Sequence, residues 1–222
     1  MVYRRTEKTV RRLAERHAKI LAAARQSVSE GGMAALQVAP VAARAGIAAG
    51  TVYRYFPSKA ELVAALVASV SEHEIAALRQ AGDAAPGPLS ALVAAIATLA
   101  ARALENPRLA WSVIGEPVDA QADVVRLGYR RALAGELETR IERAIRAKHL
   151  PAQDARLAAA AAVGVLVEGL IGPLASETTG GERDPVQALT LFVLRGLGIP
   201  DARARGLVVS RRTDDSGRRK DE

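Results

Sequence analysis

Residues 42–62 read AARAGIAAGTVYRYFPSKAEL, and this stretch decides the fold. Apolar residues recur three and four positions apart from Val38 to Ala45, as on one face of a helix. Gly46 then ends that helix, because glycine readily takes the left-handed conformation of a helix terminus. A second short helix is predicted over 48–55 and stops before Pro57. Two short helices joined by a tight turn are typical of a helix-turn-helix, whose second helix enters the major groove of DNA.

The predicted second helix has an inner and an outer face. Val52 and Phe56 lie four residues apart and are expected to pack inward, whereas Thr51, Tyr53 and Arg54 face outward. The small residues at 48–50 allow the backbone to approach the floor of the groove. Thr51 is suited to a base edge or a phosphate, and Arg54 to guanine or a phosphate. The sequence Ser58-Lys59, at the start of the next helix, predicts a phosphate contact, because helix N-termini favour anions.

Helical spacing continues on both sides of this stretch, with Pro and Gly residues at the breaks. The sequence therefore predicts an all-α fold of about nine helices in two parts. The expected organisation is a basic arm at 1–11, a helix-turn-helix domain at 12–58, a connecting helix at 59–80, a helical domain at 81–200 and a disordered tail at 201–222.

Positive charge is concentrated at one end of the chain. The net charge is +7, with 31 Lys and Arg against 24 Asp and Glu in 222 residues. Residues 1–59 hold eleven basic and three acidic side chains, a net of +8, so the remainder has a net charge of −1. This asymmetry indicates a polyanionic partner for the N-terminal segment. The arm itself either enters a minor groove or acts only as a solubilising tail.

The stretch from Ala42 to Leu62, with Gly46, Gly50 and the run from Tyr53 to Lys59, resembles the DNA-binding domain of the tetracycline-repressor (TetR) family. The resemblance covers about residues 12–72. It implies a homodimeric, all-α repressor-type regulator with a small-molecule pocket in its larger C-terminal domain. In the family, positions matching Tyr53, Tyr55 and Lys59 contact phosphates, and those matching Ala49, Gly50, Thr51 and Arg54 lie at or near bases. The full set expected at DNA is Gln37, Arg44, Ala48, Ala49, Gly50, Thr51, Tyr53, Arg54, Tyr55 and Lys59.

Two positions depart from the family pattern. Gln37 stands where Thr or Ser usually caps the second helix, and Ala48 stands where Ser or Thr often precedes the recognition helix. Losing such a cap costs about 0.5–2 kcal/mol of local stability. Pro40, in the first turn of the second helix, partly compensates because its φ angle is already fixed.

The C-terminal part is rich in Ala and Leu and has few polar groups, which favours an apolar or amphipathic ligand in a cavity between helices. The polar residues expected to bind it are Trp111, Glu116, Arg126, Tyr129 and Arg130. The alternative is that Trp111 belongs to the core, that the arginines form a solvated face and that Glu116 only begins a helix.

A homodimer is the expected assembly. Ala160, Gly164 and Gly172 are spaced by multiples of four with Glu168 between them, which allows a partner helix to approach closely. In TetR-like proteins the last two helices form a four-helix interface, and the last one here presents Ala188, Leu191, Phe192 and Arg195. The two-fold axis then sets the recognition helices roughly 34–36 Å apart, matching a palindromic operator. The alternative is that these residues form the core of a monomer.

Other classes of function have little support in the sequence. There is no Cys, the three His are scattered, and no phosphate-binding loop is present, so neither catalysis nor a metal or other cofactor is expected. With no recognisable signal peptide or membrane span, a soluble cytoplasmic protein is expected. The second function that remains open is a helical ligand-binding protein whose DNA-binding part is weak or silent.

Overall fold

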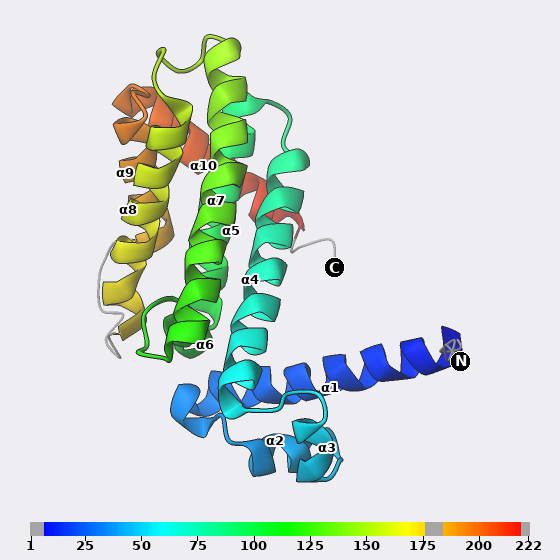
Figure 1. The fold of residues 1–222 in the computed structure, drawn as a ribbon. Helices are drawn as coiled ribbons and strands as arrows, with labels where there is room; N and C mark the ends of the chain where they lie inside the picture. The colour runs from blue at the N-terminus through cyan, green and yellow to red at the C-terminus, as the bar shows by residue number, and fades with distance from the viewer. Residues whose placement is uncertain (1–6, 176–183, 219–222) are drawn as a thin grey trace. The chain divides into compact units, whose positions relative to one another are not determined.

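The computed structural model describes residues 7–175 and 184–218, and within these ranges every regular element is helical (Figure 1). There are ten α-helices and one short 3-10 helix, η1, which confirms the all-α class with one helix more than expected. The elements are α1 (Glu7–Gly31), η1 (Met33–Ala35), α2 (Val38–Ala45), α3 (Ala49–Tyr53), α4 (Lys59–Asp83), α5 (Pro88–Glu105), α6 (Pro107–Ile114), α7 (Ala120–Arg146), α8 (Ala155–Ala175), α9 (Pro185–Gly196) and α10 (Asp201–Arg218).

The chain forms two compact units. One consists of Met1–Ser71 and Arg108–Arg126, and we call it the head; the other consists of Glu72–Pro107 and Leu127–Glu222, and we call it the body. Helices α4 and α7 contribute residues to both units. Residues 81–200 were expected to form a single domain, but residues 108–126 belong to the head.

The core of the head explains why residues 108–126 belong there. Ile20 of α1, Val41 of α2 and Val52 of α3 are completely buried together. The same cluster includes Leu109 and Val113 of α6, which turn their apolar side chains to the head and away from water. Burying a side chain of this size stabilises a protein by about 1.5–3 kcal/mol.

The tight turn between α2 and α3 has the predicted form. Gly46 ends α2 with φ 65° and ψ 38°, the left-handed conformation that other residues adopt at a cost. Gln37 and Ala48 precede α2 and α3 without a side-chain cap. At the start of α4 the Ser58 hydroxyl accepts a hydrogen bond from the Glu61 N–H at 3.1 Å. Both ends of α3 are therefore held by short, well-defined turns.

In the body, α5 packs against α8, α9 and α10, and α8 also packs against α9. By length and composition, α5 and the Ala155–Gly172 part of α8 are apolar enough to cross a membrane. Such helices also form the cores of soluble proteins, and half of the α5 window is buried inside the structure. Packing among these four helices helps to account for the low charge of α5, whereas only a third of the α8 window is buried.

Two expectations about the chain ends need correction. The expected disordered tail at 201–222 is wrong for most of its length, because residues 201–218 form α10. Ala204 and Val208, four residues apart, are buried, and α10 contacts α9 and α5. At the other end, residues 7–11 of the expected basic arm are the first turns of α1. Residues 1–6, 176–183 and 219–222 lie outside the described part.

Candidate functional site

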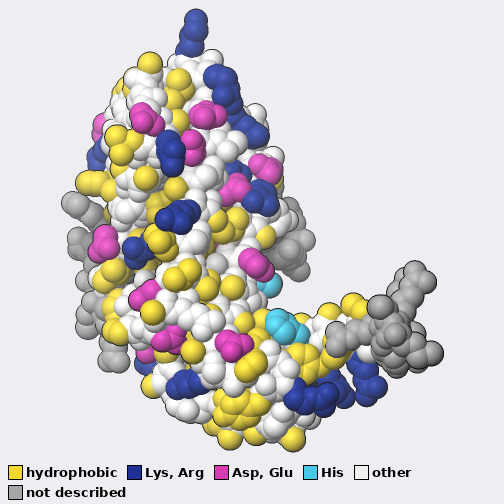
Figure 2. All heavy atoms as spheres, viewed as in Figure 1, with side chains coloured by type: hydrophobic (Ala, Val, Ile, Leu, Met, Phe, Trp, Pro, Cys, Tyr) yellow, Lys and Arg dark blue, Asp and Glu magenta, His cyan; other side chains and the backbone are white. Residues whose placement is uncertain are grey.

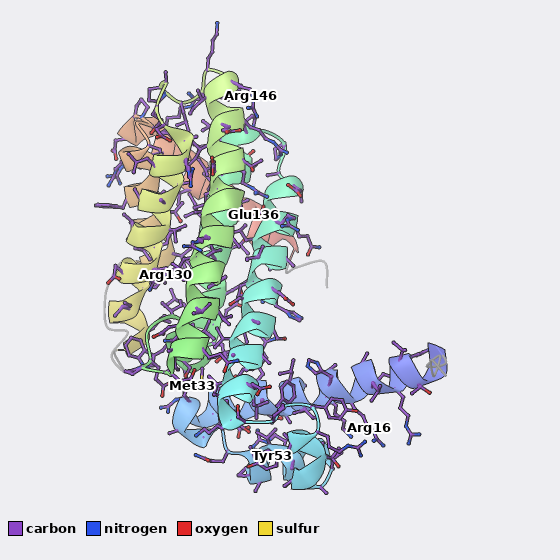
Figure 3. All side chains as sticks on the ribbon, in the orientation of Figure 1. Arg16, Met33, Tyr53, Arg130, Glu136 and Arg146 are labelled. Atoms are coloured by element: carbon purple, nitrogen blue, oxygen red, sulfur yellow. The ribbon has the colours of Figure 1, made fainter. Side chains whose placement is uncertain are left out.

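Helix α3 is anchored on one side and open on the other. Val52 is completely buried and Phe56 is 4% exposed, so the predicted inward packing is confirmed. On the opposite side Gly50 and Arg54 are exposed, and Tyr53 is 51% exposed (Figure 3). A Cβ atom added to Gly50 would meet no other atom within 4 Å. The open face is therefore free to approach a large partner closely.

Basic and aromatic side chains flank this open face. Lys59 is exposed as the first residue of α4, and Tyr55 is half-buried just after α3. The His17 ring of α1 lies 4.9 Å from the Phe56 ring and 6.4 Å from the Tyr55 ring, between ring centroids. This contact places α1 beside the end of α3.

Two residues expected at DNA make contacts within the head. The Arg44 guanidinium donates hydrogen bonds to both carboxylate oxygens of Glu30, at 2.8 and 2.6 Å, and these lower the pKa of Glu30. The Gln37 side chain donates to the Ala34 carbonyl at 3.1 Å. Ala48 and Ala49 lie at the start of α3, and Thr51 is half-buried in it.

Glu116, expected to bind a ligand, is engaged within the head. Its Oε2 atom accepts a hydrogen bond from the backbone N–H of Met33 at 3.1 Å and another from the Ser112 hydroxyl at 2.6 Å. The Arg126 Nη2 atom donates to the Ser112 carbonyl at 2.6 Å. We call the two hydrogen bonds of Glu116 to Met33 and Ser112 the Glu116 link. They connect the turn after α6 to the segment after α1.

The five expected ligand residues are divided between the two units. Trp111, half-buried next to Gly115, belongs to the head with Glu116 and Arg126, whereas Tyr129 and Arg130 belong to the body. Burial raises the pKa of Tyr129. The negative charge of Glu74 also raises this pKa, and the positive charge of Arg102 lowers it. Those two side chains form a bidentate ion pair between α4 and α5, at 2.6 and 2.9 Å.

Arg130 lines an open groove of about 300 Å³ on the body. The groove is lined by residues of α7 and α8, and its charged lining residues are Arg130 and Arg131 of α7 and Glu168 of α8. Its remaining lining is apolar or small and consists of Ala134, Ala160, Val163, Gly164 and Val167. The groove therefore combines an apolar surface with three charged side chains.

Arg140 of α7 is buried beside the C-terminal end of α4. Arg140 is 3% exposed, and its Nη1 atom donates to the carbonyl and the carboxylate of Glu136 at 2.9 and 2.8 Å. Its Nη2 atom donates to the Arg79 carbonyl and to Asp83, both at 3.2 Å. A cation at a helix C-terminus is favourable because the last carbonyls carry negative partial charge. Burial raises the pKa of Glu136, but hydrogen bonds from Arg79 and Arg140 outweigh burial and lower it.

The residues expected at a dimer interface are mostly on the surface of this single chain. Those exposed on α8 are Ala160, Gly164, Glu168 and Gly172; those exposed on α9 are Ala188, Phe192 and Arg195, while Leu191 is half-buried. Phe192 is 61% exposed and Leu157 of α8 is 67% exposed, so each of these helices has one large apolar side chain open to solvent. Arg195 pairs with Asp201 of α10.

Residues 20–66 match the model of the bacterial regulatory proteins, tetR family. Within the chain, residues 20–66 therefore carry the sequence pattern of the tetR family. The matched segment runs from the first buried residue of α1 into α4, and it contains α2, α3 and the turn between them. The head therefore contains a helix-turn-helix that matches the model of these bacterial regulatory proteins.

Solved structures share the fold of most of the chain. RolR in complex with resorcinol aligns with a TM-score of 0.68 and 22% identity, covering 90% of this chain and 95% of RolR. FadR from Bacillus subtilis in complex with stearoyl-CoA aligns with a TM-score of 0.68 and 18% identity, covering 82% and 98%. A regulatory protein in the tetR family from Rhodococcus RHA1 aligns with a TM-score of 0.63 and 20% identity, covering 84% of this chain and 98% of that protein. The sequence matches no curated protein.

Several polar contacts of this protein were not predicted from its sequence. The pairs Glu74–Arg102 and Glu136–Arg140 and the link from Glu116 to Met33 were all missed. Glu136 and Arg140 have the i, i+4 spacing of a helical ion pair, which was a usable signal. The other contacts join residues 28 and 83 positions apart, for which no local pattern exists.

Proposed function

We propose that this protein is a homodimeric transcriptional repressor that binds a palindromic operator in the cytoplasm and releases it when a small apolar or amphipathic ligand binds. The observation that supports the proposal is that α3 is buried on one side and exposed on the other, within a head that matches the tetR family model. Val52 and Phe56 hold α3 from inside, so Thr51, Tyr53 and Arg54 are presented to a major groove on a helix that is already ordered.

The proposed ligand site is in the body. The structural relatives RolR and FadR were solved with resorcinol and stearoyl-CoA, one aromatic and one with a long acyl chain, which supports an apolar or amphipathic class. Helices α4 and α7 each have residues in both units, and we propose that they transmit ligand binding to the head. The ligand acts by binding the DNA-free state more tightly, because equal affinity for both states shifts nothing.

The experiment that tests this function is selection of bound sequences from a random duplex pool at two salt concentrations. Recovery of one inverted repeat supports a dimeric, sequence-specific regulator and provides an operator for ligand screening. Failure to enrich any sequence, with binding abolished at modest salt, means that only charge attracts DNA. In that case the second candidate function, a ligand-binding protein with a silent head, replaces the proposal.

Arg54 and Lys59 should contribute to DNA binding in different ways. Arg54→Ala should relax sequence preference at one operator position, with a loss of about 1–3 kcal/mol, because the proposal places Arg54 at a base. Lys59→Ala should weaken binding to all sequences about equally and reduce the salt slope by about 1, as expected for a phosphate contact. Binding titrations on operator and scrambled duplexes distinguish the two, and equal, sequence-independent losses would refute base reading by Arg54.

The proposed dimer uses the exposed faces of α8 and α9. Gly164→Arg should convert the dimer to a monomer, because a long charged side chain prevents close approach of the partner helix. A Cβ atom at Gly164 meets nothing within 4 Å, so the substitution fits the isolated chain. Gly135→Arg on α7 is the matched control, since Gly135 is also exposed and open. Sedimentation velocity measures both, and a Gly164→Arg dimer would place the interface elsewhere.

A further inference from the structure

Helix α1 continues well beyond the core of the head. Ile20 is the first buried residue in the described part of α1, although the helix begins at Glu7. Between Thr9 and Lys19 only Leu13 is half-buried, and the other side chains are exposed. At 1.5 Å per residue this exposed part is about 15 Å long. Packing within the head does not explain such a length.

One face of this exposed part is basic. Arg12, Arg16 and Lys19 are spaced by four and three residues and therefore share a face of α1. We call these three residues the basic stripe. Among the residues that the structure describes, no carboxylate forms an ion pair with any of the three. Arg11, by contrast, lies one residue away around the helix and pairs with Glu15 at 2.9 Å.

The basic stripe lies on the side of the head that carries α3. The Lys19 Nζ atom is 3.8 Å from the position of a Cβ on Gly46, in the turn before α3. His17 contacts Phe56, just after α3. Figure 3 shows Arg16 extending from α1 toward the side of α2 and α3, and in Figure 2 basic side chains gather along that side of α1.

We propose that the basic stripe binds backbone phosphates of the duplex that flanks the base pairs read by α3. This inference rests on the proposed function, because it takes α3 to be in the major groove. A rigid helix about 15 Å long covers about four base pairs at 3.4 Å each. Guanidinium and ammonium groups on a preformed helix bind phosphates without the cost of ordering a flexible arm. The contact is with phosphates, so it adds affinity and no sequence preference.

The test compares Arg12→Gln, Arg16→Gln and their double variant with Arg11→Gln. All three single changes remove one positive charge from exposed positions of the same helix, so Arg11→Gln controls for net charge. Affinity is measured against salt concentration on a mixed-sequence duplex and on the selected operator. The operator is used as its core alone and with about five added base pairs on each side, enough to span the exposed helix. The single tryptophan, Trp111, lies in the head, and its fluorescence verifies that each variant is folded.

We expect Arg12→Gln and Arg16→Gln each to flatten the plot of log affinity against log salt by about 0.9 for each phosphate that the variant no longer neutralises. Arg11→Gln should leave this slope unchanged. The wild type should bind the extended operator more tightly than the core, and the double variant should lose that gain while keeping its preference for operator over mixed sequence. The proposal is overturned if all three single variants have the same salt slope. It is also overturned if the double variant still binds the extended operator more tightly than the core.

The same measurements separate this inference from the proposed function. If the wild type does not prefer the operator over mixed-sequence DNA, the proposed regulator fails, whereas the slopes on mixed-sequence duplex still decide whether the stripe holds phosphates. If the preference for the operator is strong but the stripe variants have the same salt slope as Arg11→Gln, the proposed function is supported. The basic stripe is then only a solvated face.

Discussion

Glu116→Ala should destabilise the head by about 2–4 kcal/mol, because two donors lose their acceptor and each such loss costs about 1–3 kcal/mol. Ser112 is completely buried and Met33 is 8% exposed, so water cannot readily replace the carboxylate. Denaturant unfolding followed by the fluorescence of Trp111 measures this loss directly, because the Trp111 ring packs against Gly115, the residue before Glu116.

Glu116→Gln is the matched control for this prediction. Both hydrogen bonds of the Glu116 link end on the same oxygen, Oε2, and the glutamine carbonyl oxygen can occupy that position. We therefore expect Glu116→Gln to lose no more than about 1 kcal/mol, the difference between a charged and a neutral acceptor. Equal losses in both variants would show that charge, rather than the two hydrogen bonds, stabilises the link.

Gly82→Ala should destabilise the body by about 1–3 kcal/mol, although alanine is normally favoured over glycine within a helix by about 1 kcal/mol. A Cβ atom at Gly82 would overlap the Arg140 guanidinium, with Nη2 at 2.7 Å and Cζ at 2.9 Å. Four hydrogen bonds hold that buried group in place, so it cannot move aside without breaking some of them. Circular dichroism during denaturant unfolding measures the change.

Two further variants isolate the cause. Gly135→Ala, in an open position on α7, should stabilise the protein by up to about 1 kcal/mol. In an Arg140→Ala background, Gly82→Ala should no longer be destabilising, because the group it displaces is gone. A Gly82→Ala penalty that persists without Arg140 would contradict this explanation.

The pH dependence of the Gly82 effect has a definite sign. The pKa of Glu136 is lowered in the folded protein, so its ionised form contributes stability above the ordinary glutamate pKa of about 4.3. That contribution is lost as the pH falls through the lowered value. The difference between wild type and Gly82→Ala should therefore be full at neutral pH and shrink in acid.

Local patterns predicted the helix-turn-helix well. The spacing of Val38 to Ala45 and the glycine at 46 define α2 and its end, and Val52 and Phe56 are buried as their spacing indicates. These features depend on residues within a few positions of one another. The disordered tail was mispredicted because 201–222 is highly charged, yet Ala204 and Val208 provide the apolar side that α10 needs.

Contacts between distant segments could not be predicted from the sequence. Nothing near Glu116 indicates that its carboxylate accepts from Met33, and nothing near Arg44 indicates its pairing with Glu30. Both side chains were assigned to an outside partner because the partner of a charged residue is not visible in a single sequence when it lies far along the chain. The proposed roles of all the site residues, Glu116 and Arg44 included, stay predictions.

The head is built from two separate segments of the chain, which limits how it can be joined to another protein. A hybrid that joins residues 1–71 to the effector part of another protein would leave behind Leu109, Val113 and Glu116. The transplanted segment would expose the apolar surface that those two side chains cover, and the Met33 N–H would have no acceptor. A transferable module would have to carry residues 108–126 as a second insert, so moving the head of this protein means moving two separate stretches of gene rather than one.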